Sequence, residues 1–150
     1  IMLNNLSDLE MIVKVYDKAE NSDKNELDGR AVDLAVGIKF GDMIKKEAKC
    51  FFAVTGSATI LDNKLSYQLE ISKIEGNHYF LMFLNKDIAV QSGLGYLELS
   101  LEDVLKLVRD TPQMRGMMLI KEIGNPEGVE NRNFSMLMIT KNMAAIALGI

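Results

Sequence analysis

Residues 78–110 decide the fold of this chain, and they read HYFLMFLNKDIAVQSGLGYLELSLEDVLKLVRD. They open with Tyr79–Leu84, the most hydrophobic run of strand length, which predicts a buried strand. A polar connection, with one expected helical turn over Ile88–Gln91, leads to a short strand at residues 96–99. An amphipathic helix is then expected to begin after Ser100.

The helix after Ser100 has the clearest local signals in the chain. The Ser100 hydroxyl is placed to accept a hydrogen bond from the N–H of Asp103, while Leu99 and Val104 occupy hydrophobic-staple positions. Pro112 prevents the helix from continuing. One broad apolar face consists of Leu101, Val104, Leu105 and Val108.

The N-terminal segment is predicted to be helical. Ser7 and Glu10 form a capping-box pattern, and the apolar spacing that follows predicts a helix over about Asp8–Glu20, before a solvated connection at residues 21–25. Residues 27–40 fit both strand and helix patterns. We favour a helix over Glu26–Val36 that stops at Gly37, and then a short helical turn over residues 40–48.

From Lys49 onward the pattern is that of strands. Cys50–Thr55 reads as a central strand that Gly56 ends, and Ala58–Leu61 reads as a short edge piece. Apolar and polar residues alternate over Leu65–Ile71, which predicts a hairpin with Tyr79–Leu84 around a turn at residues 75–77.

The C-terminal third predicts two paired strands and a last helix. The strands are Met117–Ile123 and Phe134–Ile139, with a long polar loop between them, and the helix is Lys141–Leu148, which must be covered because it is apolar almost all round. The whole chain, residues 1–150, is thus expected to be a single α+β domain. Its mainly antiparallel twisted sheet would have about five to seven strands with helices packed on it.

Composition restricts the function. The net charge is −4 and no basic stripe is present, which argues against nucleic acid as a partner. No apolar run reaches the roughly 18 residues of a membrane span, and the first residues lack a basic segment leading into an apolar one, so we expect a cytoplasmic protein with no membrane partner. The single cysteine, Cys50, lies in an apolar run and is expected to be buried and inert.

No constellation for catalysis, cofactor binding or metal binding stands out. His78 is the only histidine and has no partner for a zinc site. The glycine-bearing loops at residues 93–95 and 124–128 lack a phosphate-binding context. We therefore expect no catalytic, cofactor or metal residues, and a role other than enzymatic is favoured.

Methionine is the one unusual feature of composition. Six of the ten methionines lie between residues 114 and 143, on or near the two C-terminal strands. Such residues fill irregular cores and also line adaptable binding surfaces, so both interpretations stay open. The candidate partner surface consists of Met114, Met117, Met118, Met136 and Met138.

The order of elements over about residues 50–148 resembles the N-terminal domain of the enhanced-serine-sensitivity (SseB) proteins, a small bacterial α+β domain. The similar segments are Tyr79–Lys86, Leu99–Leu105 and the pair Asn125-Pro126. The resemblance implies a bacterial domain with no established catalytic residues.

We therefore expect a non-enzymatic protein-interaction or regulatory domain that binds a protein partner or itself. An immunity protein that blocks a toxin is an alternative, and so is a small-ligand binder or enzyme.

Overall fold

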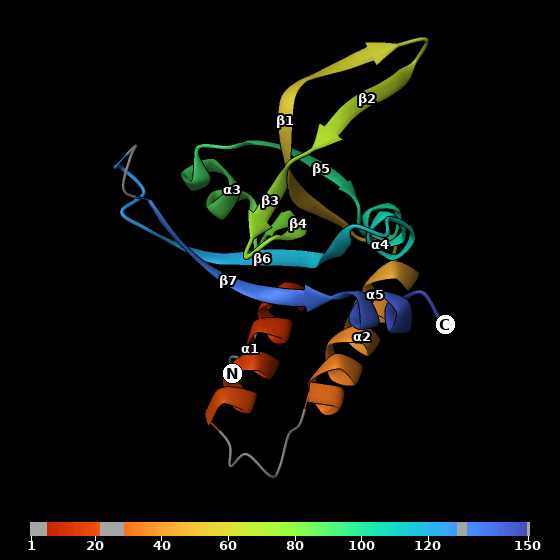
Figure 1. The fold of residues 1–150 in the computed structure, drawn as a ribbon, viewed down its shortest axis with the longest axis vertical. Helices are drawn as coiled ribbons and strands as arrows, with labels where there is room; N and C mark the ends of the chain where they lie inside the picture. Colours follow the sequence, from red (N-terminus) through yellow and green to blue (C-terminus); the bar gives the residue numbers. More distant parts are fainter. Residues whose placement is uncertain (1–5, 22–28, 129–131, 150) are drawn as a thin grey trace.

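The structure is a computed structural model, and it describes residues 6–21, 29–128 and 132–149. Within these ranges it confirms a single α+β fold in which helices pack on a mixed sheet (Figure 1). The helices are α1 (Asp8–Asn21), α2 (Gly29–Lys45), α3 (Lys86–Ser92), α4 (Leu101–Asp110) and α5 (Lys141–Ala147). The strands are β1 (Lys49–Leu61), β2 (Lys64–Leu69), β3 (Ile71–Ile74), β4 (Asn77–Phe83), β5 (Gly95–Ser100), β6 (Met114–Gly124) and β7 (Asn133–Thr140).

The seven strands form one sheet with the order β2-β1-β4-β6-β7, in which β5 also pairs with β1 and β3 also pairs with β4. Every pairing is antiparallel except β4 with β6, whose register places Phe83 opposite Ile120. A parallel pair needs a long crossover, and here α3, β5 and α4 provide it. The prediction of a mainly antiparallel sheet is confirmed.

Hydrophobic clusters lie on both faces of the sheet. Alternate residues of β4 point to opposite sides, so that Phe80 and Met82 join the cluster beneath α1, α2, α4 and α5. Tyr79, Leu81 and Phe83 join a second cluster on the other face, which includes Ala89 of α3. The central strand is thus buried on both faces, as its near-continuous apolar run predicts.

The helix caps form as predicted. The N–H of Glu10 donates to the Ser7 hydroxyl at 3.1 Å, and the Ser7 N–H donates back to the Glu10 carboxylate at 3.4 Å. The N–H of Asp103 donates to the Ser100 hydroxyl at 3.3 Å at the start of α4. The predicted helices of residues 8–20 and 101–110 therefore agree with α1 and α4, while residues 22–25 of the expected connection lie outside the described residues.

Two predicted boundaries in the first half are wrong. Gly37 does not stop a helix, because α2 runs without a break to Lys45 and includes residues 40–45 of the helical turn that was expected over residues 40–48. Gly56 does not end β1, because its φ of +73° places it in a bulge through which the strand continues to Leu61. Residues 26–28 of the expected second helix lie outside the described part of the chain.

The predicted hairpin of residues 65–71 with residues 79–84 is only partly correct. Leu65 and Leu69 belong to β2 and pair with β1, where they face Ile60 and Val54. The chain leaves strand geometry at Glu70, and only the short β3 pairs with β4. Asp62 and Asn63 both have positive φ, which is the backbone of the tight turn that joins β1 to β2.

The C-terminal elements agree with the prediction. β6 pairs with β7 over residues 116–124 and 133–140, although residues 129–131 of the loop between them lie outside the described residues. The Thr140 hydroxyl accepts from the N–H of Met143 at 3.1 Å and begins α5. α5 packs against α2, which supplies the cover that its apolar surface requires.

Candidate functional site

The methionines of the candidate partner surface do not lie together on the surface. Met114, Met117 and Met118 are buried in the core, because β6 is a central strand with helices or the second cluster on either side. For these three residues the partner-surface interpretation is wrong and the core interpretation holds. Their side chains fill the core between elements, which is the other role that methionine commonly has.

Of the five candidate methionines, only the two on β7 reach the surface. Met136 is half-buried and packs against the second cluster, while Met138 is 41% exposed. Met138 lies opposite Met118 in the β6–β7 register, so the exposed methionine on β7 faces a buried methionine on β6. β7 thus offers one exposed methionine rather than a continuous apolar surface.

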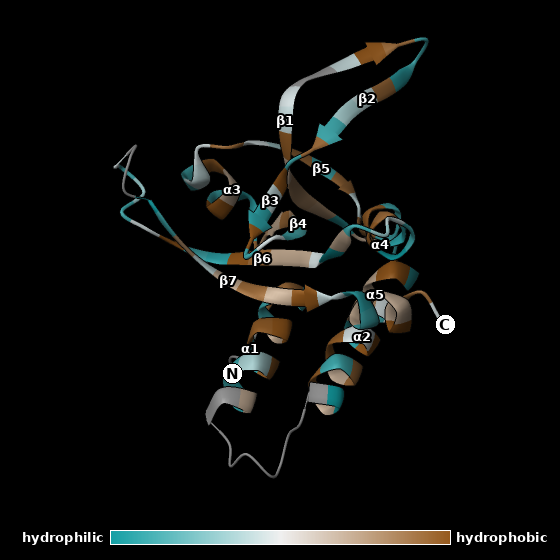
Figure 2. Cartoon of the chain, viewed as in Figure 1, coloured by the Kyte–Doolittle hydropathy of each residue, from teal (hydrophilic) through white to brown (hydrophobic). Residues whose placement is uncertain are grey.

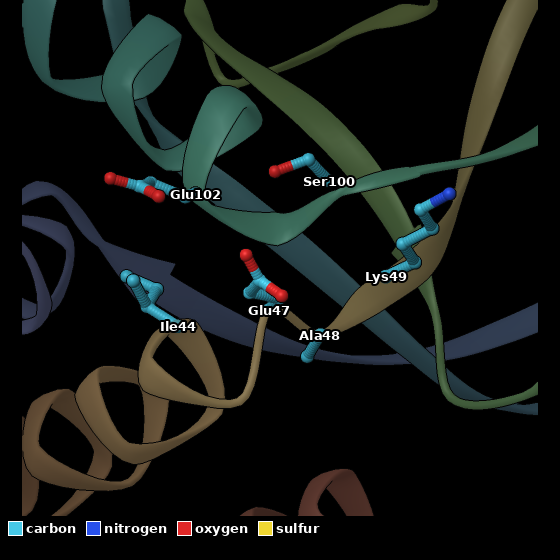
Figure 3. A pocket seen from close by; sticks show the side chains of 6 residues that line it. All are labelled: Ile44, Glu47, Ala48, Lys49, Ser100 and Glu102. Atoms are coloured by element: carbon cyan, nitrogen blue, oxygen red, sulfur yellow. The ribbon is translucent and has the colours of Figure 1, made fainter.

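A hollow of about 370 Å³ lies where α2 joins β1 and β5 joins α4 (Figure 3). A hydrogen bond of 3.0 Å from the N–H of Leu101 to the carbonyl of Ala48 closes this junction. Figure 3 shows Glu47 between two side chains that lie well apart, Glu102 and Lys49. The Glu102 carboxylate is paired with Lys106 at 3.3 Å, four residues along α4.

The polar groups of this hollow lack the arrangement that acid–base catalysis needs. Glu47 and Lys49 are exposed, and Ser100 uses its hydroxyl as the cap of α4. Strong catalytic carboxylates are usually partly desolvated and close to a second titrating group. The hollow is therefore a surface depression between two element junctions, in which Glu47 and Lys49 are exposed and Glu102 is paired with Lys106.

Cys50 lies beside a second hollow, of about 280 Å³, between the start of α1 and the end of β4. Its side chain is buried, and burial raises the pKa of the thiol to about 12, with smaller contributions from Glu98 and Asp8. A thiol with this pKa is protonated at neutral pH and is a weak nucleophile. The expectation that Cys50 is buried is confirmed, and its raised pKa supports the expectation that it is inert.

The structure shows no metal site in residues 6–21, 29–128 and 132–149, where no three His, Cys, Asp or Glu side chains are grouped to hold an ion. The lone His78 is half-buried on β4 opposite Lys73 of β3. No helix among the described residues is long and apolar enough to span a membrane.

The sequence-based prediction missed the most exposed apolar group in the described chain. It lies at the end of the β1–β2 hairpin, which projects away from the helices and from the rest of the sheet (Figure 1). The exposed fractions are 76% for Ile60, 71% for Leu61 and 47% for Leu65. We refer to these three residues as the hairpin tip; Figure 2 shows the hydrophobic arrowhead of β1 there.

The base of the β1–β2 hairpin belongs to the core, whereas its outer half does not. Val54 and Leu69 face each other at the base and are buried, and Tyr67 is half-buried beside them. Beyond Val54, β1 pairs only with β2, so the outer half is a ribbon of two strands. Two-stranded ribbons are marginally stable in water without further cover.

One signal in the sequence could have located this surface. Two apolar residues, Ile60 and Leu61, directly precede the Asp62-Asn63 turn, where the exposed end of a hairpin usually carries polar side chains. The prediction assigned Leu61 and Leu65 to separate elements and so did not bring them together.

Comparisons of the chain with models of protein families, with curated proteins and with solved structures find no match.

Proposed function

We propose that this chain is a non-enzymatic protein-interaction domain and that the β1–β2 hairpin is its binding element. The observation that carries the proposal is the hairpin tip, where three large aliphatic side chains are exposed on a ribbon that leaves the body of the domain. Exposed apolar groups of this kind are typical of surfaces that another macromolecule covers.

The energetics favour a binding role for the hairpin tip. Full burial of a Leu or Ile side chain contributes roughly 1.5–3 kcal/mol, which corresponds to at least a tenfold change in affinity for each side chain. Residues 54–69 carry one acidic and one basic residue, Asp62 and Lys64, so no net charge opposes an apolar contact there. The surface is suited to a protein rather than to a polyanion.

The lack of a catalytic arrangement supports the same proposal. Burial raises the pKa of the Cys50 thiol, and the carboxylates around the hollow between α2 and α4 are exposed or paired. The resemblance to the SseB domain, which implies no catalytic residues, agrees with this interpretation. A bacterial cytoplasm is the setting that we propose, because a single buried cysteine fits a reducing compartment.

The test replaces the hairpin tip by serine in a triple variant, Ile60→Ser, Leu61→Ser and Leu65→Ser. A matched control, Leu34→Ser with Ile38→Ser, removes two exposed aliphatic side chains from α2, which are 52% and 53% exposed. Binding is measured by light scattering after size-exclusion chromatography and by affinity capture of protein partners, and thermal unfolding verifies that each variant is folded.

We expect the unaltered chain and the α2 control to bind equally well, while the hairpin-tip variant loses binding by about tenfold or more for each side chain. Equal binding by the folded hairpin-tip variant would contradict the proposal. A chain that neither associates with itself nor captures a protein would contradict it as well.

A further inference from the structure

The outer edge of β2 is free of any strand partner among the described residues, because β2 pairs only with β1. The N–H of Glu70 donates to the carbonyl of Ala53 at 2.9 Å, on the β1 side. Backbone groups of an antiparallel strand point alternately to its two sides, so the N–H and C=O groups of Leu65 and Tyr67 point outward. Open edges of this kind are sites for the addition of another strand.

We propose that β2 pairs antiparallel with β2 of a second copy of this chain, with Tyr67 on the two-fold axis. The inference rests on the proposed function and names its partner. Pairing of this kind makes a four-stranded sheet from two β1–β2 hairpins, and each marginal ribbon gains a neighbour.

The side-chain pattern selects this register. With Tyr67 on the axis, Leu65 lies opposite the partner's Leu69, and Ser66 lies opposite the partner's Gln68, so apolar residues meet apolar ones and polar residues meet polar ones. A shift of one residue in the pairing would place Leu65 opposite Gln68 and mismatch every pair.

Charge complementarity separates this register from the others that match apolar with apolar. With Tyr67 on the axis, Lys64 lies opposite the partner's Glu70, the first residue after β2, whose N–H still donates to Ala53 of β1, and the symmetry repeats the pair. With Ser66 on the axis, Lys64 would instead face Gln68. Within the described part of one chain neither Lys64 nor Glu70 takes part in an ion pair, so both charges are available to a second copy.

The first test reverses these charges. Lys64→Glu and Glu70→Lys each place like charges opposite one another twice, and each variant should weaken dimerisation by about tenfold. The double variant Lys64→Glu/Glu70→Lys restores opposite charges and should return to within about twofold of the unaltered chain. The dimer dissociation constant is measured by analytical ultracentrifugation, and both effects should shrink in about 1 M salt.

The second test locates the axis by cross-linking. Directly opposite residues in a hydrogen-bonded antiparallel pair have Cα atoms about 5.5 Å apart, which a disulfide can span. Tyr67→Cys should therefore form a covalent dimer under mild oxidation. Ser66→Cys is the control: it faces Gln68 of the second copy, and it should cross-link far more slowly.

The outcomes separate this inference from the proposed function. Additive losses in the double variant, or faster cross-linking of Ser66→Cys than of Tyr67→Cys, would overturn the register. A folded, strictly monomeric chain that still binds another protein through the hairpin tip would overturn the self-pairing and leave the proposed function standing. A folded monomer that binds no protein would overturn both.

Discussion

Gly37 of α2 lies directly against the Ile146 side chain of α5. A β-carbon placed on Gly37 would be 2.6 Å from both Cβ and Cγ2 of Ile146, and 3.2 Å from the carbonyl oxygen of Met143. Real contacts are not this short, so the absence of a side chain at Gly37 sets how closely the two helices approach.

Gly37→Ala is therefore expected to destabilise the fold. Alanine favours a helix by up to about 1 kcal/mol over glycine, but overpacking at a helix contact costs about 1–3 kcal/mol, and the cost should prevail. Urea unfolding measures the difference. Gly41→Ala, in the same helix, is the control: its β-carbon would lie an ordinary 3.4 Å from the nearest atom. Equal stability of the two variants would contradict the close contact.

Tyr16→Phe should loosen the attachment of α1 to the edge of the sheet. The Tyr16 hydroxyl donates a hydrogen bond to the backbone carbonyl of Met138 on β7 and lies 3.5 Å from the sulfur of Met143. Loss of a hydrogen bond of this kind costs about 0.5–1.5 kcal/mol, which chemical unfolding can measure. A variant as stable as the unaltered chain would show that the bond contributes nothing.

The same hydroxyl gives the stability a dependence on pH. Burial, followed by the charge of Asp33, raises the pKa of Tyr16 above its ordinary value of about 10. A raised pKa stabilises the fold fully below the unfolded value, and the contribution is lost as pH rises above about 10. The unfolding free energy of the unaltered chain should therefore fall more steeply above that pH than that of Tyr16→Phe.

Cys50 should resist alkylation until the domain unfolds. The thiol is buried with a pKa of about 12, so its thiolate is scarce at pH 8 and its sulfur is covered. Iodoacetamide labelling, followed by mass spectrometry, should be at least about 100-fold slower in native buffer than in denaturant, on the basis of thiolate fraction alone. Rapid native labelling would place Cys50 at the surface.

Ser100→Ala should destabilise α4 by about 0.5–2 kcal/mol, because the N–H of Asp103 loses its acceptor. The measurement is thermal or urea unfolding, with Ser66→Ala, an exposed strand residue without a cap role, as the control. If both variants unfold at the same temperature or urea concentration, the Ser100 cap does not contribute to stability.

Features that depend on neighbouring residues could be predicted from the sequence. The Ser7 and Ser100 caps involve residues three positions away, and both form. Pairing between distant strands could not be predicted in the same way. The alternation of apolar and polar residues over Leu65–Ile71 indicates which face of the strand is buried, but it does not indicate which strand pairs with it. The chain divides this segment at Glu70 and gives each half to a different strand.

Gly37 and the methionines of β6 show a second reason for the errors. The low helix propensity of glycine predicted a helix end at Gly37. Inside the helix, however, the absence of a side chain at Gly37 allows Ile146 to pack closely against it. The apolar pattern of β6 indicated that both faces of the strand are buried, but it did not indicate which elements cover them. The cover includes α3 and α5, whose positions depend on the entire topology.

The packing of α2 beneath α5 also has a consequence for how the protein is made. α5 is the last helix that the structure describes, and it begins 96 residues after α2 ends at Lys45. At about 5–20 residues per second, a ribosome needs roughly 5–20 s to add those residues. During that interval the side of α2 that α5 later covers lacks this cover, so we expect chaperones to bind α2 on the nascent chain.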